Sequence, residues 1–120
     1  MFKLLEGMPP DVLGIEASGK VTHKDYQDIL IPKAEALMAK GPVKALFVVA
    51  PEFAGYELKA LWDDSVFGLK HWRDFRRVAV VADQEWIHGV MTMFRPLILC
   101  EFRLFKLAEL AAAKSWITSS

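Results

Sequence analysis

Two short runs of consecutive apolar residues constrain the fold more than any other feature. The segment Lys44–Ala50 contains Ala45-Leu46-Phe47-Val48-Val49, and Arg77–Ala82 contains Val78-Ala79-Val80-Val81. A strand without polar alternation is typical of a sheet that is covered on both faces, as parallel sheets are. Parallel neighbours need a long crossover connection, which is usually a helix. The sequence therefore predicts an α/β fold with a largely parallel central sheet.

The remaining strands and helices fit around these two runs. Pro and Gly residues in Gly7–Asp11 predict a turn between two strands that pair as an antiparallel hairpin. We expect right-handed crossovers and helices on the sheet faces, in a single domain over residues 1–120. The other expected strands are Phe2–Leu5, Val12–Ser18 and Glu101–Phe105, and Pro51–Gly55 is expected to be a loop. The first expected helix starts at Thr22, and the later ones cover Leu58–Phe75, Glu85–Leu99 and Leu107–Ile117.

Signals for the start, an irregularity and the end of the first helix are all present in the sequence. Thr22 is placed to cap it, and Asp25 occupies the acidic position of a capping box. Pro32 lies within the helical pattern and removes one backbone hydrogen bond, so we expect a kink there. Lys40 and Gly41 mark the end of the helix.

Composition excludes several classes of protein. Lys and Arg together number 15, as do Asp and Glu, so the chain lacks the basic excess of a general nucleic-acid binder. The absence of net charge also favours self-association, so a homodimer is one expected assembly. The only cysteine is Cys100, which excludes an intrachain disulfide. The charged N-terminus does not resemble a signal peptide, and no window is apolar enough to cross a membrane. We expect a cytoplasmic protein that touches a membrane at most from its inner face.

The segment Glu85–Leu99 indicates a binding function. Its polar positions, Glu85, His88, Thr92 and Arg95, recur at helical spacing and form one narrow stripe, while almost everything else is apolar. Such a helix is apolar over much more than the roughly 100° that one sheet covers. A neighbouring helix, a second subunit, a ligand or a lipid surface must cover the rest. Pro96 should end or bend the helix near Arg95.

Catalytic patterns are weaker. Glu52, Asp83 and Glu85 follow the two apolar strands and could converge at the carboxyl edge of the sheet, where acid–base chemistry would need them close together. The alternative is that Asp83 or Gln84 caps the next helix. The three histidines have no metal-ligand spacing, and the sequence contains no phosphate-binding loop or nucleophile elbow, so no cofactor is expected.

The basic run from His71 to Arg77 has two interpretations. Cations suit the C-terminal end of a helix, and they also suit anionic lipid headgroups, with Trp72 or Phe75 inserted beside them. The residues assigned to membrane or partner contact are Trp72, Arg73, Arg76, Met93, Leu97 and Ile98.

Motifs spread over most of the chain resemble the SpoIIAA-like family of small bacterial proteins, which has the STAS-type fold of anti-sigma-factor antagonists. No single motif is specific, and the resemblance depends on their order. They are Gly19–Thr22 with Asp25, Tyr26 and Pro32; Phe53–Tyr56 with Trp62 and Asp63; Arg77–Asp83 with Trp86; and Phe102–Phe105 with Ala111, Trp116 and Ile117.

The resemblance implies a five-stranded mixed sheet with about four helices, similar to lipid-carrying CRAL-TRIO-type domains. It also implies a capacity to hold nonpolar ligands or touch membranes, and no enzyme activity. One departure concerns the antagonists' phosphoserine switch, because residues 51–56 contain no Ser or Thr. Ser65 has a superficially similar acidic context but falls within a predicted helix, where it fits a surface serine better.

We therefore expect a non-enzymatic domain that binds a nonpolar small molecule or acyl chain between Leu58–Phe75 and Trp86–Leu99. A protein-interaction module without the phosphoserine is the alternative, and an enzyme using Glu52 and Asp83 is a third reading. The expected ligand-binding residues are Phe53, Tyr56, Trp62, Trp86, Val90, Met91 and Phe94.

Overall fold

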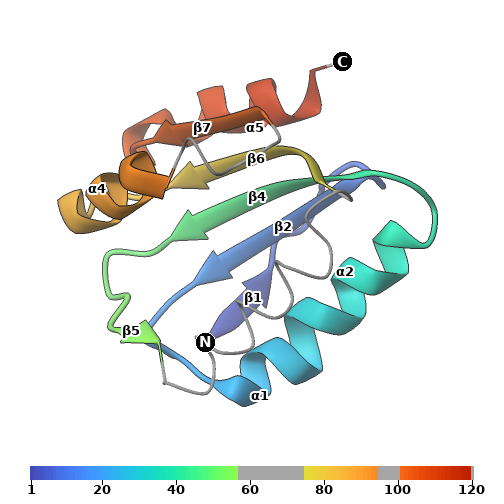
Figure 1. The fold of residues 1–120 in the computed structure, drawn as a ribbon, viewed down its shortest axis with the longest axis horizontal. Coiled ribbons are helices and arrows are strands. Elements are labelled where there is room, and N and C mark those ends of the chain that lie inside the picture. Colours follow the sequence, from blue (N-terminus) through green and yellow to red (C-terminus); the bar gives the residue numbers. More distant parts are fainter. Residues whose placement is uncertain (57–74, 95–100, 120) are drawn as a thin grey trace.

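The computed structural model describes residues 1–56, 75–94 and 101–119, without the side chains of Tyr56, Val90 and Phe94. Five strands form the main sheet, in the order β1-β2-β4-β6-β7 (Figure 1). Only the β1–β2 pair is antiparallel, and the other three pairs are parallel. The strands are β1 (Phe2–Leu4), β2 (Val12–Ala17), β4 (Val43–Val49), β6 (Phe75–Val81) and β7 (Glu101–Phe105). The predicted mixed five-stranded α/β sheet is confirmed.

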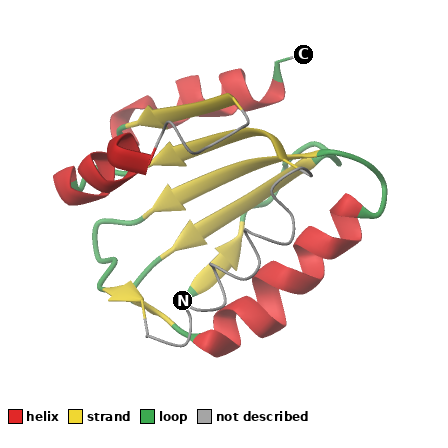
Figure 2. Cartoon of the chain, in the orientation of Figure 1, coloured by secondary structure: helices red, strands yellow, loops and turns green. Residues whose placement is uncertain are grey.

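The described helices cover both faces of this sheet (Figure 2). Alternate residues of β4 point to opposite faces, as the pleat requires. Val43 packs with α1–α2, and Val49 packs with α4. Leu46 and Val48 pack with α5 on the opposite face. The helices are α1 (His23–Asp25), which continues through the π-helix Tyr26–Leu30 into α2 (Ile31–Met38); α4 (Glu85–Phe94); and α5 (Leu110–Thr118), after the 3₁₀ turn η3 (Leu107–Glu109).

The first helix begins as the sequence predicts. The Thr22 hydroxyl accepts a hydrogen bond from the Asp25 backbone, and the Asp25 carboxylate accepts one from the Thr22 backbone at 2.8 Å. Partial burial of Asp25 opposes its ionisation, but the Thr22 hydrogen bonds and the nearby N-terminal ammonium outweigh burial and lower the pKa of this carboxyl. The corner between strand β3 (Lys20–Val21) and α1 is therefore held by a charged cap.

The expected irregularity near Pro32 takes the form of a π-helical turn. Ile31 donates its N–H to the Tyr26 carbonyl, one residue further back than in an α-helix. Proline has no N–H to donate at the next position, so the wide turn lies directly before the break in the hydrogen-bond ladder. Gly41 ends the helix with φ of 137°, and its N–H bonds to Met38.

Two local predictions were wrong. Gly55 lies in a two-residue strand, β5 (Gly55–Tyr56), which pairs in parallel with β3 (Lys20–Val21). Phe75 belongs to strand β6 and pairs with Val43, although the sequence pattern placed it in the preceding helix. Arg77 lies in β6, as predicted, and Arg76 belongs to the same strand.

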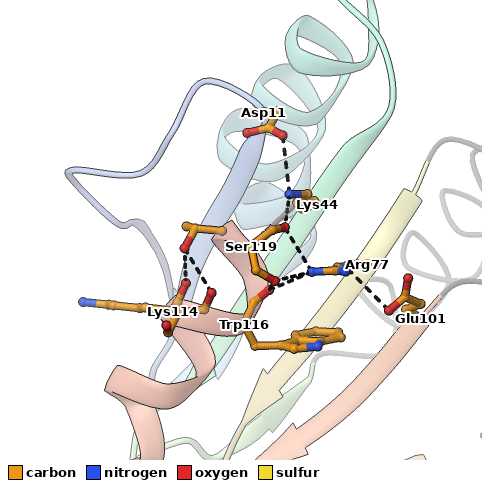
Figure 3. A network of polar contacts seen from close by, with 9 residues as sticks. Asp11, Lys44, Arg77, Glu101, Lys114, Trp116 and Ser119 are labelled. Carbon is orange, nitrogen blue, oxygen red and sulfur yellow. Dashed lines mark hydrogen bonds and ion pairs between the residues drawn. The ribbon is translucent and has the colours of Figure 1, made fainter.

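Two cations attach the end of α5 to the amino ends of the strands (Figure 3). Lys44 on β4 is only 5 % exposed and donates to the Ser119 carbonyl at 2.9 Å. Arg77 on β6 donates to the carbonyls of Trp116 and Ser119, at 2.9 and 3.0 Å, and to the Ser119 hydroxyl at 2.6 Å. Its guanidinium also lies over the Trp116 ring, 5.2 Å from the centroid. These contacts satisfy carbonyls that a helix C-terminus leaves without partners.

Candidate functional site

One backbone carbonyl accepts hydrogen bonds from the segments that follow β4 and β6, and so connects the carboxyl ends of these two strands. Ala50 O accepts hydrogen bonds from the Phe53 N–H at 3.0 Å and from Gln84 Nε2 at 3.1 Å. This shared acceptor brings the loop after β4 next to the start of α4. In α/β sheets, ligands bind beyond the carboxyl ends of the strands, which is where this junction lies.

A pair of aromatic rings lies at the junction. The Phe53 and Trp86 centroids are 6.3 Å apart, with an interplanar angle of 20°. Phe53 is half-buried and contacts both core clusters on this face of the sheet. Trp86, in contrast, is 57 % exposed. The two rings form a flat apolar surface that is anchored on one side and open to solvent on the other.

The α4 helix has one face on the sheet and a different apolar stripe in solvent. Ile87 is buried in the cluster that includes Val80 and Phe102, and Met91 packs against the same cluster. Met93 is 73 % exposed and lies two turns from Trp86, on the same side of the helix. The sequence-based expectation of excess apolar surface on this helix is met at these two positions.

Two polar side chains lie beneath this apolar surface. His88 Nε2 is 2.5 Å from the Ala82 carbonyl, so that nitrogen carries a proton. Gln84 Oε1 is buried and has no hydrogen-bond partner within the described part of the chain. The bond from Nε2 to Ala50 fixes the amide orientation, because the flipped amide would face one oxygen with another. The junction therefore holds one buried acceptor that a donor from a ligand or water can satisfy.

The three acidic residues at this edge have separate environments. Asp83 Oδ1 accepts the Leu107 N–H at 2.8 Å and so fixes the start of η3 after β7. Glu52 and Glu85 are exposed. No group of three or more metal-ligating side chains occurs among residues 1–56, 75–94 and 101–119.

The structure describes only some of the residues predicted for the site. It brings Phe53 and Trp86 together, packs Met91 against the core and exposes Met93. Arg76 is exposed near the amino end of β6, at the opposite end of that strand from α4. Trp62, Trp72, Arg73, Leu97 and Ile98 lie outside the described residues, as does Ser65, and the side chains of Tyr56, Val90 and Phe94 lie outside the description.

Sequence reasoning missed the roles of Gln84, His88 and the Ala50 carbonyl. Gln84 was considered only as a helix cap, whereas its side chain reaches across to the end of β4. A polar residue directly after a buried strand was the available signal. It also missed a separate cavity of about 380 Å³ at the β1 edge, between the β1–β2 connection and α2. Gly14, a glycine within a strand, was the signal for that close approach.

Comparisons with known proteins agree with this architecture. The SpoIIAA-like family model matches residues 12–118. A crystal structure of an uncharacterised protein with a SpoIIAA-like fold from Shewanella loihica PV-4 is 30% identical, with a TM-score of 0.78, and the match covers 98% of this chain and 92% of that one. No curated protein matches. The structural similarity and the family match over nearly the whole length lead to one conclusion: this chain belongs to the SpoIIAA-like family.

Proposed function

We propose that this protein is a non-enzymatic domain that binds a nonpolar small molecule or acyl chain at the carboxyl edge of the sheet. The observation that carries the proposal is the exposure of Trp86 and Met93 beside the half-buried Phe53. Fully burying a side chain as large as methionine or phenylalanine contributes about 1.5–3 kcal/mol, so covering this surface is favourable. A ligand bound against the Phe53–Trp86 pair and the outer stripe of α4, which consists of Trp86 and Met93, removes this apolar surface from water.

Reversible membrane contact in the cytoplasm is part of the same proposal. Tryptophan suits the boundary between lipid and water because its ring is apolar and its N–H is polar. No helix among the described residues has the length and apolar character required to span a bilayer. In this proposal a lipid surface meets the exposed side of α4 that carries Trp86 and Met93, and it releases or accepts the bound molecule there.

A protein-interaction module is the second candidate. Trp86 and Met93 are two turns apart on one side of α4, which is the spacing that a partner helix or a second copy of this chain would contact. Family membership supports this candidate, since the STAS-type fold also serves antagonists that act by binding proteins.

Probe uptake tests the proposal. The uncharged probe N-phenyl-1-naphthylamine should gain fluorescence with the wild-type chain, and the gain should fall at least fivefold in Trp86→Ala. Thr92→Ala is the matched control, because Thr92 is exposed on a different side of α4. Co-sedimentation with phosphatidylcholine–phosphatidylglycerol vesicles measures membrane contact with the same variants.

Three outcomes separate the candidates. Uptake that depends on Trp86 supports the carrier. A concentration-dependent dimer that Met93→Ser dissociates, without any probe uptake, favours the interaction module. Uptake that is equal in wild type and Trp86→Ala would place the site elsewhere and overturn the assignment of these residues.

A further inference from the structure

A cavity of about 380 Å³ lies at the β1 edge of the sheet, at the far side of β2 from the Phe53–Trp86 pair. Its walls come from the end of β1, the β1–β2 connection, the first half of β2, and α2 with the residues that follow it. This volume is within the range of about 300–1,000 Å³ for pockets that bind small molecules. None of its lining residues belongs to the carboxyl-edge site.

The wall formed by the β1–β2 connection is held close to β2. Leu5 N–H bonds to the Gly14 carbonyl at 2.9 Å, and Val12 N–H bonds to the Pro9 carbonyl at 3.0 Å. A Cβ at Gly14 would lie 2.9 Å from Met8 Cγ and 3.0 Å from Leu5 Cβ, so only glycine allows this approach. Two consecutive prolines, Pro9 and Pro10, further restrict the connection. The cavity wall is therefore preorganised.

The lining combines apolar side chains with polar groups, and its polar surface is the larger. Leu4, Leu5, Met8 and Leu37 supply the apolar side chains. Among the described residues, the charged groups in the lining are Lys33 and Lys40. Lys33 lies on α2 and Lys40 follows the end of that helix, with Leu37 between them in the sequence. Both are exposed, and neither has an ion-pair partner among residues 1–56, 75–94 and 101–119.

We propose that this cavity binds a free medium-chain carboxylate, with the chain against Leu4, Met8 and Leu37 and the carboxylate at Lys33 or Lys40. Contact with these apolar side chains favours the hydrocarbon chain, while a paired ammonium selects the anion over the neutral alcohol of the same length. No carboxylate side chain of the described residues lines the cavity.

Titration of the full chain with decanoate, decanol and acetate, each below its aggregation concentration, tests the site. Backbone amide shifts in an NMR spectrum locate binding: decanoate should move Gly7 and Gly14. Decanoate should bind at least fivefold more tightly than decanol, and acetate should not bind measurably. The double variant Lys33→Gln/Lys40→Gln should remove the preference for decanoate over decanol.

The matched control is Lys24→Gln/Lys114→Gln, which removes two exposed ammonium groups from outside the cavity. It should keep the decanoate preference. Equal losses in both double variants would show a general charge effect and overturn the proposal, as would decanoate shifts confined to α4. Trp86→Ala should leave the Gly14 shift unchanged, so failure of the carboxyl-edge site and failure of this cavity give different results.

Discussion

The two ends of the parallel strands differ in how their polar and apolar groups are satisfied. At the amino ends, Lys44 and Arg77 are bonded to the last carbonyls of α5 and have the acidic neighbours Asp11 and Glu101 (Figure 3). At the carboxyl ends, Trp86 is largely in solvent and Gln84 Oε1 is buried without a partner in the described chain. At the amino ends, the polar groups are hydrogen-bonded within the described chain. At the carboxyl ends, one buried hydrogen-bond acceptor and an exposed apolar surface are available to a ligand or partner.

Because of this difference, we expect the amino ends of the strands to contribute to stability and the carboxyl ends to contribute to binding. Bonds at the amino ends connect residues far apart in sequence, and unfolding breaks all of them together. The exposed side chains at the carboxyl ends add little to folding, because they remain in water in the folded state. Substitutions at the two ends should therefore change different measured quantities.

Arg77→Ala should give the largest effect. It removes three hydrogen bonds to the end of α5 and the contact with the Trp116 ring, and it should lower the free energy of unfolding by about 2–4 kcal/mol. Chemical denaturation followed by circular dichroism measures this change. Arg76→Ala is the control, since Arg76 is the exposed neighbour on the same strand, and it should change stability by less than about 0.5 kcal/mol. Equal losses in the two variants would contradict the described role of Arg77.

Asp25→Asn removes the acidic member of the Thr22–Asp25 capping box, and the expected loss is about 1 kcal/mol at neutral pH. The pKa of Asp25 is lowered in the folded state, so its stabilisation is complete above the unfolded value of about 3.9. It is lost as pH falls through the lower folded value. The stability difference between wild type and variant should therefore shrink below about pH 4. Asp28→Asn, at an exposed position in the same helix, is the control. A difference that grows on acidification would contradict the sign of the shift.

Much of the fold follows from local sequence signals. The Thr22–Asp25 capping box and the uninterrupted apolar runs are contained within a few residues, and both predicted their elements. Strands β3 and β5 were missed because each has two residues, and their pairing joins Lys20 to Gly55 across the whole of α1–α2 and β4. Arg77 was correctly placed in a strand, but its bonds to Ser119 were not predicted, because the two residues are 42 positions apart in the sequence.

The candidate site was less predictable than the fold. Helical periodicity predicted that the helix around Trp86 has more apolar surface than the sheet covers. This prediction was possible because the periodicity of a helix depends on its own segment alone. The Gln84 bond to Ala50 and the cavity beside Gly14 depend on which segments meet in space. The hydrophobic periodicity of one segment does not predict which other segments it contacts, because those contacts depend on the strand order.

Lys44→Met tests whether the buried ammonium at the amino ends is needed for stability. It loses the bond to Ser119 and removes a charge that burial penalises, so the two effects should nearly cancel and leave a change within about 1 kcal/mol. Ser119 keeps its hydrogen bonds from Arg77 in this variant. Denaturation under the same conditions as for Arg77→Ala gives the comparison. A loss as large as that of Arg77→Ala would show that the two cations act as one unit.

Met93→Ser should have the smallest effect on folding and a clear effect on binding. Met93 is 73 % exposed, so its replacement should change the free energy of unfolding by less than about 0.5 kcal/mol. Loss of its apolar surface should weaken uptake of N-phenyl-1-naphthylamine, because the occupant loses part of its cover on α4. A thermal melt and a probe titration on the same sample measure both quantities. If stability fell and uptake did not change, the outer stripe of α4 would serve the fold, and the contrast between the two ends of the sheet would be lost.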